Sequence, residues 1–346
     1  MIHDGAPRRL HEMLLERYRH GRSAAWAGSF YPARVRLDGA PVDEHTAVRA
    51  GQQIAYCHFR EDEPPPGPPP VLLHEDEWLV AVLKPDRMPV NPAGVFYFSA
   101  LAIRMREELG NPELTPLHRL DLETSGVLLF SRRRAHLGRF HRLFTDKALR
   151  KVYRALVHGH FPRERMEIAG RIVPDTGSAI HTRLRLEPSA AGPADAAAPG
   201  AVPADGSGGS LTRILGVAHH RSADGAPLSE LLLEPVTGKT NQLRVHLAAV
   251  GHPIVGDKKY HPDEGVFLDW YAHRDFARLR QALLLPRQAL HCQALSFLHP
   301  FSGNWLELSA PADVWAEKVR GLIVPADLRV PQGGTTGREE IPRRPA

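Results

Sequence analysis

The residues with the clearest chemical potential form a short charged cluster, His118 to Glu123, directly before the apolar run Val127–Phe130. Asp121 and Arg119 lie two positions apart, and a nearby cation keeps a carboxylate ionised and able to act as a base or nucleophile. A Thr-Ser-Gly turn leads into the apolar run, whose length and composition are typical of a buried strand. We therefore expect Asp121 in a loop at the mouth of a rigid strand, although a surface Arg–Asp pair would explain the same residues.

A second candidate is Tyr153, in the segment Lys151-Val152-Tyr153. Tyr153, Ala155 and Val157 alternate onto one face, and this period of two predicts a strand. Tyrosine combines an apolar ring with a polar hydroxyl, so this residue is most simply a core aromatic whose hydroxyl reaches water. Composition alone therefore gives Tyr153 no role in chemistry.

The third candidate is Arg244, at the start of a predicted helix. Gly238 provides a turn, Thr240 or Asn241 can cap the helix, and Gly251 ends it. The helix has one apolar face, made of Leu243, Leu247 and Val250. Arg244 is therefore expected in the first helical turn.

Together these segments resemble the signature sequences of the RluA-type pseudouridine synthases. The stretch HRLDLETSG at residues 118–126 matches the family pattern HRLDxxTSG, the Lys-Val-Tyr segment follows at the family's usual distance, and a third match runs from Thr237 to Asp257. Further likenesses are the strand Trp78–Leu83 before a Lys-Pro loop and a closing strand at Leu290–Pro300. Ordered matches over roughly residues 71–310 are far more specific than one short motif.

The resemblance implies an RNA pseudouridine synthase, an isomerase that breaks the N1–C1′ bond of a uridine and rejoins the base through C5. The implied fold is α+β, with a mixed, largely antiparallel sheet, flanking helices and a cleft across the sheet. Because atoms are neither gained nor lost, no cofactor and no metal are implied. The partner is structured RNA, ribosomal RNA or tRNA or both, whose stacked target base must first be extruded.

The resemblance also implies roles for individual residues. Asp121 looks like the catalytic aspartate, acting as a base on the ribose or as a nucleophile, and Arg244 looks like the partner that salt-bridges and orients it. Arg119 looks like the arginine that enters the space left by the flipped base. Tyr153 looks like the residue that stacks on the uracil and assists proton transfer at C5.

Lys84 and Gln242 are further expected substrate-binding residues. Lys84 ends the strand at 78–83, where it can approach a phosphate, place the catalytic loop or simply be a surface lysine. Gln242 matches the third motif of the family. The family usually has Arg and His where this chain has Lys239 and Asn241, two replacements that stay polar and bear on fine positioning.

A basic segment follows the first motif. Between residues 132 and 154, Asp146 is the one acid against nine cations: Arg132, Arg133, Arg134, Arg139, Arg142, Lys147, Arg150, Lys151 and Arg154. Apolar residues recur at helical spacing at Leu137, Phe140 and Phe144, which predicts an amphipathic helix with a basic face. A solvated helix face explains this pattern without a ligand, but the excess of cations favours phosphate contacts, through Arg139, Arg142 and Lys151 in particular.

A proline-rich linker at residues 64–70 divides the chain, because fixed φ angles favour an extended spacer. We assign residues 71–325 to the catalytic domain. Residues 188–210 are rich in Ala, Gly, Pro and Ser without an apolar period, which predicts a disordered insertion within that domain. Residues 326–346 have no core pattern and are predicted to be a flexible tail.

Residues 1–63 are predicted to be an N-terminal accessory region. The sequence predicts a helix over 9–18, a hairpin over 35–42 with an Asp-Gly turn, and a strand over 54–59. This order resembles the small RNA-binding module, named after a ribosomal protein, that precedes many pseudouridine synthase domains. An extension that merely packs on the core explains the residues equally well.

Composition limits the remaining possibilities. The chain has 346 residues and a net charge of +5, which is compatible with a polyanionic partner. No uncharged apolar run approaches the roughly 20 residues needed to span a bilayer, and the N-terminus lacks an apolar signal region. The two cysteines cannot form a disulfide framework. We expect a cytoplasmic monomer that does not associate with membranes.

Two other functions would use parts of the same sequence. An RNA-binding protein of this fold that has lost catalysis would keep the basic surface but lack Asp121 or Tyr153, and both are present. A metal-dependent hydrolase is suggested by the 20 histidines. However, no HExxH string occurs, and His158-Gly159-His160 and His219-His220 lack a third ligand at metal spacing.

Overall fold

The computed structural model describes residues 8–10, 12–13, 35–43, 45–56, 63–65, 67–163, 167–188 and 209–324. Contacts between Cα atoms divide the chain into two compact units, Met1–Pro64 and Pro65–Ala346. Most of the predicted helix at 9–18, nearly all of the predicted insertion at 188–210 and the tail at 326–346 lie outside the described residues, so these three stay predictions.

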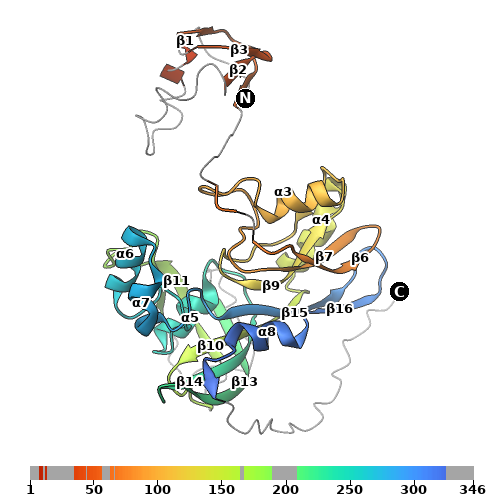
Figure 1. Cartoon of the computed structure of the whole chain (residues 1–346). Helices are drawn as coiled ribbons and strands as arrows, with labels where there is room; N and C mark the ends of the chain where they lie inside the picture. Colours follow the sequence, from red (N-terminus) through yellow and green to blue (C-terminus); the bar gives the residue numbers. More distant parts are fainter. Residues whose placement is uncertain are drawn as a thin grey trace. The chain divides into compact units, whose positions relative to one another are not determined.

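The N-terminal unit contains two small antiparallel sheets (Figure 1). Their strands are β1 (Arg8–Arg9) with β4 (Ala47–Val48), and β2 (Val35–Leu37) with β3 (Ala40–Pro41) and β5 (Ile54–Tyr56). The predicted hairpin is confirmed between β2 and β3. Asp38 and Gly39 have φ angles of 49° and 84°, as a tight two-residue hairpin turn requires. The predicted strand at 54–59 is described only over β5.

The larger unit is built on one mixed, mostly antiparallel sheet. Its main path runs β12-β11-β13-β14-β10-β15-β9-β7-β6, and among the described strands only β15 and β9 pair in parallel. The strands in chain order are β6 (Val71–Glu75), β7 (Leu79–Lys84), β8 (Thr115–Pro116), β9 (Ser125–Ser131), β10 (Arg150–His158), β11 (Glu167–Pro174), β12 (Leu184–Glu187), β13 (Ser210–Ser222), β14 (Pro227–Pro235), β15 (Leu290–Leu298), β16 (Trp305–Ser309) and β17 (Ile323–Val324). The predicted α+β class is confirmed.

Helices flank this sheet (Figure 1). They are α3 (Leu101–Glu108), α4 (Leu137–Thr145), α5 (Gln242–Ala249), α6 (Glu264–His273), α7 (Phe276–Leu283) and α8 (Ala312–Val319). The predicted amphipathic helix is α4, which buries Phe140 and Leu143 and exposes its arginines. The predicted helix that begins near Asn241 is α5, and Gly251 follows it with a φ of 83°. Among the described helices, none is long and apolar enough to cross a bilayer.

Two hydrophobic clusters form the core of the larger unit. One lies around β7, β9 and α4, and the other around β10, β14 and α5. Tyr153 packs against both clusters, so it lies at their boundary. Every residue of β9 is buried, which makes this strand a rigid support for the loop that precedes it.

The start of β9 explains the glycine in the first motif. Ser125 and Gly126 pair with His291 and Cys292 on the parallel strand β15. Gly126 has a φ of 125°, and a Cβ atom there would collide with the backbone of Cys292. A side chain at this position would push the two strands apart, so the close approach requires glycine.

Candidate active site

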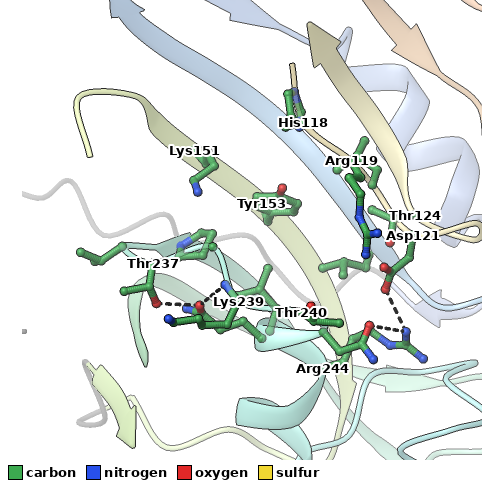
Figure 2. A pocket seen from close by; sticks show the side chains of 18 of the residues that line it. His118, Arg119, Asp121, Thr124, Lys151, Tyr153, Thr237, Lys239, Thr240 and Arg244 are labelled. Atoms are coloured by element: carbon green, nitrogen blue, oxygen red, sulfur yellow. Dashed lines mark hydrogen bonds and ion pairs between the residues drawn. The ribbon is translucent and has the colours of Figure 1, made fainter. Parts of the chain in front are cut away.

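A cavity of about 630 Å³ opens where the loop 118–124 faces strand β10 and the start of helix α5 (Figure 2). This volume is in the range of small-molecule sites, roughly 300–1,000 Å³. The cavity is lined by residues from all three sequence motifs, including Arg119, Asp121, Lys151, Tyr153 and Arg244. The fold therefore brings together side chains that are more than a hundred positions apart in the chain.

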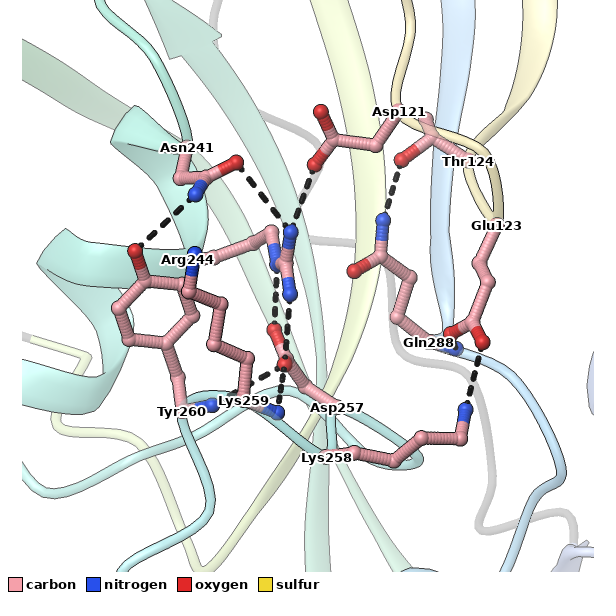
Figure 3. Close-up of polar contacts among 10 residues, drawn as sticks. All are labelled: Asp121, Glu123, Thr124, Asn241, Arg244, Asp257, Lys258, Lys259, Tyr260 and Gln288. Carbon is pink, nitrogen blue, oxygen red and sulfur yellow. Dashed lines mark hydrogen bonds and ion pairs between the residues drawn. The ribbon is translucent and has the colours of Figure 1, made fainter. Parts of the chain in front are cut away.

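Asp121 is the one acid among the described residues that line this cavity. Its Oδ2 atom accepts a hydrogen bond of 2.8 Å from Nη1 of Arg244, so the expected salt bridge is present (Figure 3). The Asp121 side chain is 35% exposed, and its Oδ1 atom has no hydrogen-bond partner among the described residues. The carboxylate is therefore oriented by Arg244 through one oxygen and presents the other oxygen to the cavity.

Arg244 is itself fixed by a second carboxylate, Asp257. Arg244 Nε donates to Asp257 Oδ2 at 2.6 Å and Nη2 donates to Oδ1 at 2.9 Å, a bidentate pair. Burial raises the pKa of the fully buried Asp257, but the charge and hydrogen bonds of Arg244 outweigh this and hold it below the usual range. Burial likewise lowers the pKa of Arg244, and Asp257 and Asp121 more than restore it. The guanidinium stays charged and has one orientation.

Two polar residues complete the support of Arg244, and the sequence did not indicate their roles. Asn241 Oδ1 accepts from Arg244 Nη1 at 3.2 Å, and Asn241 Nδ2 donates to the hydroxyl of Tyr260 at 3.1 Å. The guanidinium also lies over the Tyr260 ring, 5.0 Å from its centroid. Asn241 has a φ of 54° and makes no side-chain cap bond, so it serves Arg244 and not the helix terminus.

Tyr153 lines the same cavity from β10 (Figure 2). Its hydroxyl lies within hydrogen-bonding reach of Cys292. Burial, with a smaller contribution from Cys292, raises the pKa of the Tyr153 phenol well above its usual value. The side chain is therefore a neutral phenol throughout the physiological pH range, and it offers an aromatic face together with a hydroxyl group.

Most of the other charges in the cavity are positive. Arg119, Lys147, Lys151 and Lys239 line it, and none of them pairs with a carboxylate within the described ranges. His118 also lines it, and burial, with the nearby Lys151 charge, lowers the pKa of His118 to about 3, so this ring is neutral. Such a site attracts a polyanion. The neutral His118 ring adds no further charge to it.

Gln242 is present in the lining, but its amide is used by the protein. Its Oε1 accepts from Thr237 Oγ1 at 2.6 Å and from the Lys239 amide at 3.1 Å, while its Nε2 donates to Leu211 O at 2.9 Å. Gln242 is only 4% exposed. In the structure this residue fixes the turn that carries Lys239 and leads into α5, and its predicted substrate contact stays a prediction.

The structure places Lys84 away from the cavity, in contrast to the surface position and the phosphate contact considered from the sequence. Lys84 is fully buried and does not line the cavity. Its ammonium group donates to the carbonyl oxygens of Pro85 at 2.9 Å, Met88 at 2.7 Å and Leu122 at 3.4 Å. Leu122 directly follows Asp121, so Lys84 helps to hold the loop that carries Asp121.

Arg139 and Arg142 lie on α4, exposed and outside the cavity lining, so their predicted phosphate contacts stay predictions. Arg139 stacks over the Phe301 ring, 4.9 Å from its centroid. The basic segment is also less charged than its sequence indicates. Glu75 on β6 pairs with Arg132, and Glu234 and Glu230 on β14 pair with Arg150 and Arg154 on the neighbouring strand β10.

The structure does not favour the metal-dependent alternative. Within the described part of the chain, no three His, Cys, Asp or Glu side chains converge in a way that could hold a metal ion. His160 and His219 stack on each other with ring centroids 4.8 Å apart, and His219 bonds the carbonyl of Phe161. These histidines serve packing and hydrogen bonding.

The largely antiparallel sheet, the cavity carboxylate paired with an arginine, the partly buried tyrosine and the cavity cations without a carboxylate partner among the described residues fit what the family resemblance implied. Residues 78–249 match the family model described as RNA pseudouridylate synthase. The dual-specificity RNA pseudouridine synthase RluA of Pasteurella multocida is 30% identical over 250 residues, which cover 72% of this chain and 95% of that protein. An uncharacterised RNA pseudouridine synthase of Synechocystis is 29% identical and covers 86% of this chain and 91% of that protein.

The solved structure of human RNA pseudouridylate synthase domain containing 1 is also similar, with a TM-score of 0.55 and 25% identity, covering 75% of this chain and 90% of that chain. The chain belongs to the RluA-type family of RNA pseudouridine synthases. It is an isomerase that acts on RNA.

Proposed function

We propose that Asp121 is the catalytic residue that acts on the ribose of the target uridine. The observation that carries this proposal is its geometry: one carboxylate oxygen is held by Arg244 at 2.8 Å, and the other faces the cavity without a partner among the described residues. A carboxylate held in this way is ionised and aimed. The same geometry serves a base on the ribose and a nucleophile at C1′, so both routes stay open.

The remaining cavity residues fit the other demands of the reaction. The uridine must leave its stack to reach Asp121, and Arg119, exposed at the cavity, is suited to fill the vacated space. Tyr153 offers a neutral ring for stacking on the uracil and a hydroxyl near the carbon that loses its proton. When C5 bonds to C1′, its proton leaves and N1 gains one, so the isomerisation balances without any co-reactant.

We propose structured RNA, ribosomal RNA or tRNA or both, as the substrate. Lys147, Lys151 and Lys239 surround the cavity as free cations, which suits the phosphates on either side of an extruded nucleotide. The dual specificity that the name of the Pasteurella relative states supports an RNA of more than one kind. Such RNA is recognised by its shape and by displayed, unstacked bases.

A transcriptome-wide pseudouridine map tests the function and the role of Asp121 together. A strain that lacks this protein is compared with the same strain carrying the wild type or Asp121→Ala. We expect one or a few sites to vanish in the deletion strain and to return only with the wild type. Restoration of every site by Asp121→Ala would overturn the catalytic assignment. If no site depended on the protein at all, the catalytically inactive RNA-binding alternative would replace it.

A further inference from the structure

Three buried lysines from different parts of the chain donate hydrogen bonds to the segment that directly follows Asp121. Lys84 at the end of β7 donates to Leu122 O at 3.4 Å. Lys258, after α5, donates to Glu123 Oε1 at 2.6 Å (Figure 3). Lys318, on the C-terminal helix α8, donates to Ser125 Oγ at 3.0 Å. Their donors therefore reach three of the four residues that follow Asp121.

The segment before β15 makes further contacts with the loop that carries Asp121 and with the neighbouring Lys-Pro loop. The backbone N–H of Gln288 donates to Glu123 Oε2 at 3.1 Å, and the side-chain Nε2 of Gln288 donates to Thr124 Oγ1 at 2.5 Å. Arg287 forms an ion pair with Asp86, next to the Lys-Pro loop. Each of the residues 121–125 thus has a polar tether, and the loop has little freedom to shift relative to the sheet.

Lys318 is the most unusual of the three lysines because of where it comes from. Helix α8 lies beyond residues 78–249, the range that matches the family model. Its buried face consists of Trp315, Lys318 and Val319, so the lysine occupies a core position of the helix. Lys318 is 5% exposed, and besides Ser125 it donates to the carbonyl of Leu290 at 3.0 Å.

Ser125 is the point at which the loop becomes the strand β9. Its hydroxyl contacts Lys318 on one side and Nδ1 of His291 on the other, at 2.8 Å. Burial lowers the pKa of His291 to about 3, so this ring is neutral. Lys318 therefore joins the two parallel strands β9 and β15 at the base of the catalytic loop, through a serine side chain and a Leu290 carbonyl.

We propose that Lys318 is a positioning residue for the isomerase reaction: through Ser125 it holds the base of the loop that presents Asp121. This inference rests on the proposed role of Asp121. The ammonium group donates hydrogen bonds to Ser125 at the base of the loop and to Leu290 on β15, and Lys318 does not line the cavity. Misplacement of a reacting group by about 1 Å lowers rates by up to about a hundredfold.

A packing role and a positioning role predict different results for Lys318→Met, which keeps the length of the side chain but removes its donors. Burial lowers the pKa of Lys318 to about 7, so the fold already opposes this charge and its removal should not lower the midpoint of thermal unfolding. A packing role predicts a lower midpoint and an unchanged rate. A positioning role predicts a lower rate and an unchanged or higher midpoint.

The experiment uses the full chain and total RNA labelled with 5-tritiated uridine, prepared from a strain that lacks the enzyme. Rejoining at C5 releases tritium, and enzyme in excess gives a maximal rate and a half-saturating concentration. We expect Lys318→Met to lower the maximal rate about tenfold with half-saturation within about twofold. Ser125→Ala should cause a similar loss, and the double variant should be no slower than either. Arg320→Met, an exposed cation just after α8, is the matched control and should be unchanged.

A wild-type maximal rate for Lys318→Met would overturn the inference, as would losses that multiply in the double variant, because Lys318 would then not act through Ser125. Asp121→Asn in the same assay separates the two proposals. If Asp121→Asn is inactive and Lys318→Met is fully active, only the positioning role is wrong. If Asp121→Asn is also active, the proposed role of Asp121 is wrong as well.

Discussion

Lysines lie on both sides of the loop that carries Asp121, and their surroundings differ between the open side, which faces the cavity, and the buried side. On the open side, Lys147, Lys151 and Lys239 line the cavity and have no carboxylate partner among the described residues. On the buried side, Lys84 and Lys318 are almost inaccessible, and each donates to the backbone or to side chains of the protein. A free cation is available to bind a phosphate, whereas an engaged cation can only hold the protein in place.

This difference shows why a lysine in a motif does not by itself indicate a ligand. Lys84 stands beside a family motif, yet its donors reach three carbonyls and none of them reaches the cavity. Lys239 replaces the arginine usual in the family and lines the cavity. We infer that the cavity lysines determine affinity for RNA and the buried lysines determine the rate of the chemical step.

The largest expected effect is that of Asp121→Asn. This substitution leaves the lysines on both sides of the loop unchanged and removes the carboxylate charge of Asp121. We expect the rate of tritium release to fall by a factor of about 10⁴ or more, because Asp121 is the one carboxylate among the described residues that line the cavity. Affinity for RNA, measured by filter binding, should stay within about threefold, since the cavity cations are untouched. A variant that kept a tenth of the wild-type rate would contradict the catalytic role.

The next largest effect concerns Arg244, which pairs with both Asp121 at the cavity and the buried Asp257. Arg244→Met leaves the buried Asp257 with the backbone donors of Lys259 and Tyr260 but without its paired cation, which costs about 3–5 kcal/mol of stability. The rate should also fall about a hundredfold, because Asp121 loses its orientation. Urea unfolding and single-turnover rates measure the two losses.

Arg154→Met is the matched control for Arg244, because it also removes a part-buried arginine paired with a carboxylate, here Glu230. Arg154 lies beside Tyr153 in the sequence but does not line the cavity. It should retain the wild-type rate. An equal loss of rate in both variants would show that the effect of Arg244 is merely destabilisation.

The sequence allowed much of the open side of the site to be predicted. The strand after the first motif, the alternation around Tyr153 and the apolar face of α5 have local periodic patterns, and the structure confirms each element. The Asp121–Arg244 salt bridge spans 123 positions and was expected only through the family resemblance. The structure gives its length and shows that Asp257 supports it.

The buried side could not be predicted, because its contacts join distant positions and have no periodic signature. Asp257 lies within the third family match, but nothing local assigns it to Arg244. The sequence does contain one indication of a buried Lys318, because its spacing from Trp315 and Val319 places it on the apolar face of α8. The positive charge of the basic segment was overestimated, because sequence alone does not show that glutamates from distant strands pair with three of its arginines.

A smaller effect sharpens the description of the open side. Lys239→Met should raise the Kd for labelled total RNA about fivefold and reduce the slope of log K against log salt by about 1, because one phosphate contact is lost. The maximal rate should be unchanged. Arg320→Met, an exposed cation outside the cavity, should leave the slope as it is. An unchanged slope for Lys239→Met would remove Lys239 from the RNA-binding surface.

A further effect on the buried side is a pH dependence of stability. Burial lowers the pKa of Lys318 from 10.5 to about 7, and Asp86, Arg287, Lys84 and Glu123 are the charged groups that act on it. Between these two values the unfolded chain binds more protons than the folded chain, so the free energy of unfolding rises with pH. The wild type should gain up to about 1.4 kcal/mol per pH unit over Lys318→Met between pH 8 and 10. Urea titrations of both proteins measure this, and parallel curves would contradict the low pKa.

The most direct test of the division between binding and positioning places one variant from each side in the same assay. Lys239→Met and Lys318→Met are compared with the wild type in single-turnover tritium release over a range of enzyme concentrations. The account predicts that Lys239→Met raises the half-saturating concentration and keeps the maximal rate, while Lys318→Met lowers the maximal rate and keeps half-saturation. If both variants changed the same parameter, the two sides of the loop would not have separate roles.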